Sequence, residues 1–221
     1  MGFLLAFFIS AIADWVAVGL QRSRLRYVTK PAALIFLIAW FTVLGNWEGN
    51  LLWFGLGLVF SLLGDIALLL QARYFLLGLL AFLVAHVFYI IGFNAEPLIA
   101  DWRIILSVIM VGAVIRIVYP QIIGRLRRQV QNRRLFIPIL LYAATISLML
   151  LSALSTISRP AWQSSSVILA IAGAILFVLS DSVLATGRFL RPVPKGDLIV
   201  IVSYHLGQLG IAAAALLAFR V

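Results

Sequence analysis

The feature that most constrains this chain is a succession of apolar segments, each about as long as a bilayer is thick. A membrane-spanning α-helix needs about 20 consecutive, mostly apolar residues. Of the 221 residues, 64% are hydrophobic and only 11% are charged, whereas soluble domains contain about 25% charged residues. The pattern predicts an all-α polytopic membrane protein that forms a single transmembrane domain over residues 1–221.

Polar breaks divide the apolar residues into eight expected spans. A bilayer offers the backbone no hydrogen-bonding partners, so each span is expected to be a helix. The second span is the shortest, and the loops are expected to be short. The predicted helices cover residues 3–20, 31–45, 51–70, 74–93, 103–119, 135–155, 163–187 and 197–219.

Basic residues fall almost entirely on one side of the predicted bundle, 14 of the 17 lysines and arginines. The positive-inside rule makes that side cytoplasmic, which places both termini outside and, in a bacterium, the protein in the inner membrane. Cytoplasmic loops and anionic lipid headgroups explain the formal charge of +10, so no nucleic-acid partner is expected. The residues on this side are Arg22, Arg24, Arg26, Lys30, Arg73, Arg116, Arg125, Arg127, Arg128, Arg133, Arg134, Arg188, Arg191 and Lys195.

Two aspartates interrupt otherwise apolar spans, Asp65 in SLLGDIALLL and Asp181 in FVLSDSVLAT. A charged group at the centre of a membrane helix costs about 2.5–3.5 kcal/mol on insertion scales, so such groups usually face a cavity or a partner. In both contexts a small residue precedes the aspartate, and an arginine and a phenylalanine follow. The similarity allows two parallel four-helix repeats, residues 1–94 and 103–221, related by an axis along the membrane normal.

Other polar residues fall at depths similar to those of the two aspartates. Because neighbouring spans run in opposite directions, these residues would gather around one cavity that opens to the inner leaflet, with Lys30 at its mouth. Each also has a structural interpretation as a hydrogen bond between helices, and Asp14 could pair with Arg22. The candidate site residues are Asp14, Lys30, Asp65, His86, Tyr89, Tyr142, Asp181, Tyr204, His205 and Gln208.

Two carboxyl groups in a desolvated site suit general acid–base catalysis, because one can keep its proton while the other stays ionised. Cleavage of a carbon–oxygen bond through an oxocarbenium-like transition state needs such an acid and such an anion. A lipid is the substrate most available to a cavity open to the inner leaflet. The sequence contains no phosphate-binding glycine loop, nucleophile elbow or HExxH motif, and no spacing that supports metal ligation. No metal or cofactor is therefore expected.

A series of motifs lies in order along nearly the whole chain. They are Lys30–Pro31, SLLGDIALLL, AFLVAHVFYI, YAATISLM around Tyr142, FVLSDSVLA and SYHLGQLGI. Together they resemble the YhhN-like lysoplasmalogenase family. The resemblance implies an integral membrane hydrolase that cleaves the vinyl ether bond of lysoplasmalogens to a fatty aldehyde and glycerophosphocholine or glycerophosphoethanolamine. Its partners would be the lysophospholipid substrate and membrane lipids.

For that reaction, Asp65 and Asp181 are expected to share the acid and base roles, in either assignment. The remaining candidates would tune the acids or hold the headgroup, and Lys30 with nearby arginines would hold the phosphate. The alternatives are a proton-coupled transporter of a small lipid-like or organic solute, a lipid hydrolase of another kind, and a scaffold without activity. We expect a monomer or a weak dimer.

Overall fold

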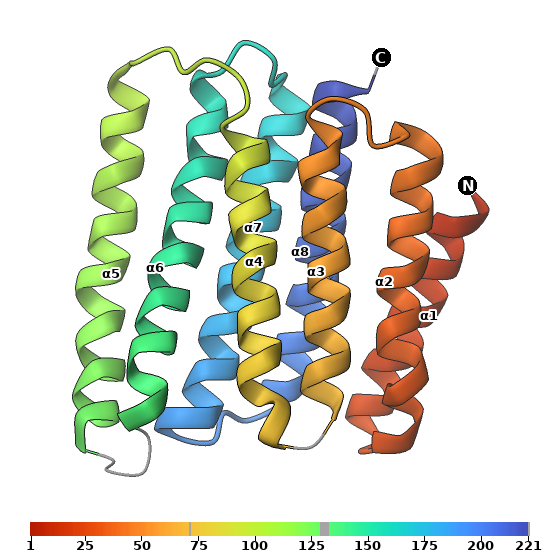
Figure 1. Cartoon of the computed structure of the whole chain (residues 1–221), viewed down its shortest axis with the longest axis vertical. Helices are drawn as coiled ribbons and strands as arrows, with labels where there is room; N and C mark the ends of the chain where they lie inside the picture. The colour runs from red at the N-terminus through yellow and green to blue at the C-terminus, as the bar shows by residue number, and fades with distance from the viewer. Residues whose placement is uncertain (71, 129–132, 221) are drawn as a thin grey trace.

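The described part of the chain forms one bundle of eight α-helices that run alternately up and down (Figure 1). This computed structural model describes residues 1–70, 72–128 and 133–220, without the side chains of residues 72, 114, 117–119, 121–123, 125–128 and 133–135. Single turns follow α3, α6 and α7: η1 (Ala72–Tyr74), η3 (Thr156–Ser158) and the π-helical η4 (Thr186–Leu190). The helices are α1 (Gly2–Gly19), α2 (Ser23–Gly45), α3 (Leu51–Leu69), α4 (Phe75–Phe93), α5 (Trp102–Arg128), α6 (Arg133–Ser155), α7 (Ser164–Ala185) and α8 (Gly196–Phe219).

The helices make this an integral membrane protein. Among the described residues, seven helices are long and apolar enough to cross a bilayer, and α5 contributes the shorter apolar stretch Trp102–Ala113. Large apolar side chains such as Leu5 and Ile168 are exposed, as expected where lipid rather than water surrounds a helix. The predicted all-α polytopic class is confirmed.

Two of the predicted helix boundaries are wrong, and both lie beside a proline. The second span was expected to begin at residue 31, but α2 begins at Ser23 and contains Pro31. The fifth was expected to end at residue 119, but α5 continues to Arg128 and contains Pro120. Proline lacks an amide proton and is best tolerated in a first helical turn. A helix in a bundle can nevertheless continue past it when neighbouring helices satisfy the freed groups.

The helix α8 is the centre of the bundle, because it packs against α1, α2, α3 and α7. Its closest approach is to α7, where an added Cβ at Gly207 would lie 3.0 Å from the carbonyl oxygen of Gly173. Small residues let membrane helices approach each other this closely. The contact holds the polar residues of α8 inside the bundle.

The two halves of the chain contain similar helix pairs. The helix α2 packs against α3 as α6 packs against α7, and α3 packs against α4 as α7 packs against α8. Contacts between the halves include α4 with α6 and α8 with α2. The parallel repeat of residues 1–94 and 103–221 nevertheless stays a prediction.

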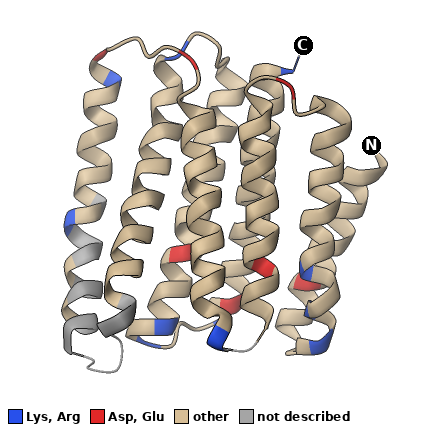
Figure 2. Cartoon of the chain, in the orientation of Figure 1, with Lys and Arg blue, Asp and Glu red and all other residues tan. Residues whose placement is uncertain are grey.

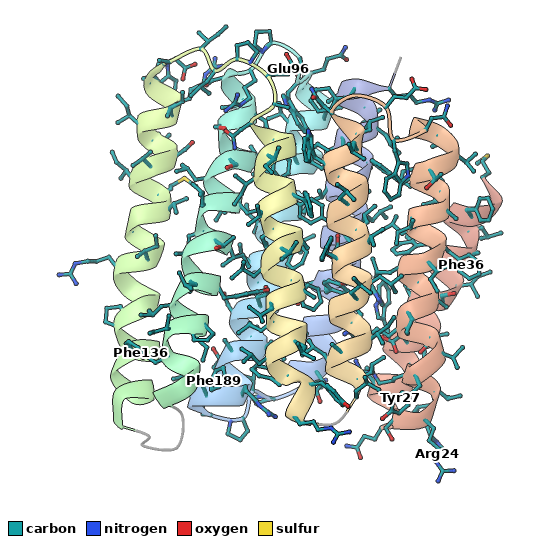
Figure 3. The ribbon with its side chains drawn as sticks, viewed as in Figure 1. Arg24, Tyr27, Phe36, Glu96, Phe136 and Phe189 are labelled. Carbon is teal, nitrogen blue, oxygen red and sulfur yellow. The ribbon has the colours of Figure 1, made fainter. Side chains whose placement is uncertain are left out.

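Charged residues gather near the two ends of the bundle, and a few acidic residues lie within its lower half (Figure 2). Both termini lie at the upper end in Figure 1. Figure 3 shows Arg24 and Tyr27 at the lower end and Glu96 at the upper end. We call the lower end the basic end. It is formed by the α1–α2, α3–α4 and α7–α8 connections, which carry Arg22, Arg73, Arg191 and Lys195. The predicted basic side chains of Arg125, Arg127, Arg128, Arg133 and Arg134 lie outside the described residues.

At the end opposite the basic end, Arg159 ties two loops together. Its buried guanidinium donates hydrogen bonds to the backbone carbonyl of Glu96 and to the side-chain oxygen of Asn94. Nearby, the amide of Ile99 donates to the carbonyl oxygen of Ser158 at 3.0 Å. Arg159 was not among the residues that the sequence singled out, since its partners lie more than 60 residues away.

We expect Arg159→Met to lower the unfolding temperature of the purified protein without changing its chemistry. The two loops would lose the hydrogen bonds that join them, and a hydrogen bond from a charged donor contributes about 1.5–3 kcal/mol. Differential scanning fluorimetry in detergent measures the shift. Arg103→Met is the matched control, because its side chain is 47% exposed and exposed ion pairs contribute little. An equal shift in both variants would contradict the assigned role.

Candidate active site

Asp65 on α3 lies at the centre of a buried three-helix contact. Its carboxyl is fully buried, and Lys30 Nζ of α2 lies 2.8 Å from its Oδ1. The Tyr204 hydroxyl of α8 donates a hydrogen bond to Oδ2 at 2.8 Å. Both oxygens therefore have a partner, and the ammonium of Lys30 stabilises the ionised carboxylate.

The expected place of Lys30, at the mouth of a cavity, is wrong. Lys30 is only 8% exposed, and its ammonium is paired with Asp65 inside the bundle. The reason is the longer α2: Lys30 lies in the second turn of a helix that continues past Pro31, not at the start of one. Lys30 is therefore a partner of the buried carboxylate and is not free to hold a phosphate.

Asp181 on α7 has a different environment from Asp65. The Tyr142 hydroxyl of α6 donates a hydrogen bond to Asp181 Oδ2. Among the described residues, no lysine or arginine forms a salt bridge with Asp181, and both Asp181 and Tyr142 are partly exposed. Asp65 thus has a cation and a phenol as partners and no exposed surface. Asp181 has a phenol as its partner and is partly exposed.

His86 on α4 lies beside the Asp181–Tyr142 pair. Its ring meets that of Tyr142 edge to face, with ring centroids 5.4 Å apart. The Nδ1 atom is 2.6 Å from the carbonyl oxygen of Phe82. A carbonyl only accepts hydrogen bonds, so Nδ1 carries the proton and Nε2 of the neutral ring is a bare acceptor. That Nε2 atom is buried and has no hydrogen-bond partner among the described residues.

Tyr89 and Gln208 form a second polar contact farther from the basic end. The Tyr89 hydroxyl donates to Gln208 Oε1 at 2.6 Å. Gly57 of α3 makes room for the phenol, since an added Cβ there would lie 2.2 Å from the ring. The Gln208 amide nitrogen and the Ser61 hydroxyl are buried without partners among the described residues. Ser61 was not predicted, although it precedes Asp65 by one helical turn.

Phe177 links these contacts. It lies one turn before Asp181 on α7, and its ring contacts those of His86 and Tyr204 at centroid distances of 4.7 Å and 5.5 Å. Phe177 thus packs between Tyr204, the partner of Asp65, and His86, the neighbour of the Asp181–Tyr142 pair. That the two aspartates act as one site stays a prediction. Sequence reasoning missed Phe177 because an apolar residue in an apolar helix carries no distinguishing signal.

The remaining predicted residues are Asp14 of α1 and His205 of α8. The Thr29 hydroxyl donates to Asp14 Oδ1 at 2.8 Å, and Arg26 Nε lies 3.5 Å from the same oxygen. Asp14 is fully buried, and its cationic partner is Arg26 rather than the alternative partner Arg22. The Trp15 indole donates to His205 Nδ1 at 3.0 Å.

A groove of about 730 Å³ opens at the basic end, between the end of α1 and the α7–α8 connection. Leu184, one turn after Asp181, lines it, and so do Arg188 and Lys195. The described residues contain no group of three or more metal-ligating side chains. The site therefore offers carboxyl groups, phenols and imidazoles for proton transfer, close to a basic surface.

Comparison with known proteins finds a family match and several related proteins. The model of the YhhN family matches residues 25–215. Lysoplasmalogenase TMEM86A of Bos taurus is 32% identical over 160 residues, which cover 72% of this chain and 63% of the relative. Lysoplasmalogenase TMEM86A of Homo sapiens is 30% identical, with 72% and 63% covered, and lysoplasmalogenase TMEM86B of Homo sapiens is 29% identical, with 72% and 61% covered. The chain thus spans less than two thirds of each of these relatives. No solved structure matches it.

Proposed function

The chain belongs to the YhhN family, and from that premise we propose that it hydrolyses the vinyl ether bond of lysoplasmalogens. The products would be a fatty aldehyde and glycerophosphocholine or glycerophosphoethanolamine. The observation that carries the proposal is that Asp65 and Asp181 differ in their partners and in their exposure. Vinyl ether hydrolysis needs one group that gives a proton and one that starts as an anion and accepts a proton from water, and the environments of Asp181 and Asp65 differ in that sense.

Asp181 is the proposed acid. It is partly exposed, and the Tyr142 hydroxyl occupies only Oδ2, so Oδ1 can carry the proton toward a substrate. Proton transfer from Asp181 to the vinyl ether β-carbon converts the double bond into an oxocarbenium ion. Phe177 and the surrounding apolar helices exclude bulk water, which strengthens the electrostatic interactions in the site.

Asp65 is the proposed anion, and it acts through Tyr204. Because Asp65 is fully buried, water cannot reach its carboxylate directly. A water molecule that adds to the oxocarbenium carbon gives a proton to the Tyr204 oxygen, while the Tyr204 hydroxyl proton passes to Asp65 Oδ2. The hemiacetal then collapses: its hydroxyl proton goes to Asp181, and the proton on Asp65 returns through Tyr204 to the departing glycerol oxygen. Both carboxyl groups end as they began.

The basic end is the proposed cytoplasmic side, so the substrate would enter from the inner leaflet. Since Lys30 is engaged with Asp65, the phosphate would bind to Arg188 and Lys195 at the groove. Arg188 follows Asp181 by seven residues, about 10 Å along a helix at 1.5 Å per residue. That distance suits a headgroup phosphate and a vinyl ether separated by a glycerol unit.

The test is to incubate the purified protein in detergent with a lysoplasmalogen and, separately, with its saturated ether analogue, and to identify products by mass spectrometry. We expect aldehyde and glycerophospholipid from the vinyl ether alone, because a saturated ether has no double bond to protonate. Release from neither substrate would contradict the proposal. In that case, uptake of the lipid into protein-containing vesicles without chemical change would favour a transporter.

A further inference from the structure

We propose that Asp14 and Trp15 of α1 are positioning residues that hold the two partners of Asp65 in place, Asp14 acting on Lys30 and Trp15 acting on the Tyr204 side. This inference rests on the proposed function, since it assigns a role within the same reaction. Neither residue touches Asp65 directly. Each binds the residue next to one of its partners.

The first branch runs from Asp14 to Lys30. Arg26, Thr29 and Lys30 lie on one face of α2, because residues three and four positions apart are neighbours on a helix. Asp14 accepts the Thr29 hydroxyl at 2.8 Å and pairs with Arg26. The next residue in the chain, Lys30, reaches Asp65 at 2.8 Å. Asp14 therefore fixes the rotation of the turn that carries Lys30.

This turn has a specific need for support. Pro31 follows Lys30 and has no amide proton, so α2 loses one backbone hydrogen bond beside the lysine. A long lysine side chain also loses conformational entropy when it is held in one geometry. Asp14 holds this turn in place through its hydrogen bond to Thr29, the residue before Lys30, and its ion pair with Arg26.

The second branch runs from Trp15 to Tyr204. The Trp15 indole donates to His205 Nδ1, and the rings of His205 and Tyr204 lie 5.6 Å apart. His205 is fully buried, and Phe7 of α1 meets its ring edge to face. The contact sets the rotation of α8 at the position where Tyr204 points to Asp65.

The placement of these residues in α1 is informative. The helix is mostly exposed, and its buried face consists of Phe7, Ala11, Asp14 and Ala17. A buried carboxylate is a costly way to attach a helix in a membrane, since apolar or small residues would serve. The YhhN family match begins at residue 25, so both residues lie outside the matched region.

The test measures kcat and KM for vinyl ether hydrolysis by Asp14→Asn and Trp15→Phe. A small displacement of a reacting group can reduce rates by up to about 100-fold. We expect kcat to fall by roughly tenfold or more in Asp14→Asn with KM unchanged, because the substrate-binding surface is intact. The matched controls are Glu48→Gln and Trp102→Phe, since both residues are exposed and far from the site.

A double-mutant cycle separates positioning from general stabilisation. If Asp14 acts through Lys30, Asp14→Asn should have little further effect in a Lys30→Met background, where there is no ammonium to position. If Asp14 only stabilises the bundle, the two effects multiply. Thr29→Val provides a second variant, which removes the hydrogen bond to Asp14 and leaves both charges in place.

One readout does not depend on activity. Amine-reactive labelling followed by mass spectrometry reports the accessibility of Lys30, and we expect faster labelling of Lys30 in Asp14→Asn than in the unmodified protein. Unchanged kcat, multiplying effects in the cycle or unchanged labelling would each overturn the inference. If the wild-type protein releases no aldehyde but Lys30 is still labelled faster in Asp14→Asn than in the wild type, the proposed function is overturned. The positioning of Lys30 is then still supported.

Discussion

Asp181→Asn is expected to reduce vinyl ether hydrolysis by about 10²–10⁴-fold, the usual contribution of a general acid. Asparagine has nearly the same shape and still accepts the Tyr142 hydroxyl through its oxygen, but it has no acidic proton to transfer to carbon. The unfolding temperature should change little, because the side chain is partly exposed and has no salt bridge among the described residues. Aldehyde release per folded protein measures the loss.

The control for Asp181→Asn is Glu48→Gln, the same carboxyl-to-amide change at an exposed position of the opposite end. It should retain wild-type rates. If Asp181→Asn keeps full activity while folded, Asp181 is not the acid. A large loss of binding with an unchanged kcat would also contradict the proposed role, since an acid acts in the chemical step.

Lys30→Met is expected to damage both stability and activity. It leaves the fully buried Asp65 carboxylate without its cation, and breaking one side of a buried ion pair costs about 3–5 kcal/mol. The double variant Lys30→Met/Asp65→Asn should recover most of the lost stability, because a neutral amide beside a thioether no longer requires a charge partner. Activity should stay low in both variants, since neither retains an ionised, paired carboxylate at this position.

Thermal unfolding and aldehyde release, measured on the same preparations, check this pair of expectations. Recovery of stability without activity would support Asp65 as the anion of the site. Full activity in the double variant would show that the pair serves only to hold α2, α3 and α8 together. A double variant as unstable as Lys30→Met would contradict the electrostatic explanation.

The membrane character of the chain and the extents of six of its eight helices could be predicted, because apolar runs of membrane length leave the backbone few alternatives to a helix. The failures at α2 and α5 share one cause. A sequence pattern cannot show whether neighbouring helices support a proline inside a helix, so Pro31 and Pro120 were treated as helix limits. The misplacement of Lys30 followed directly from the first of these errors.

The candidate residues were identifiable for a related reason. Polar and ionisable groups are costly in an apolar span, so Asp14, Asp65 and Asp181 stand out in any reading of the sequence. Thr29, the partner of Asp14, and Trp15, the partner of His205, do not stand out, because both look like ordinary residues at a membrane interface. Phe177 and Gly57 shape the site through packing alone, and packing depends on what lies opposite.

By itself the sequence determined that the chain spans a membrane as helices and which acidic residues lie among the apolar residues of those helices. Only the tertiary structure decided how these acids differ. Asp65 has a cation and a phenol from residues 35 and 139 positions away in the chain. Asp181 has a phenol and, among the described residues, no cation in a salt bridge. The physical reason is the distance along the chain over which each effect acts. The free-energy cost of burying an acid depends on that residue and its own helix, so the sequence shows it. The partner that offsets this cost comes from whichever helix packs alongside, so only the tertiary structure shows it.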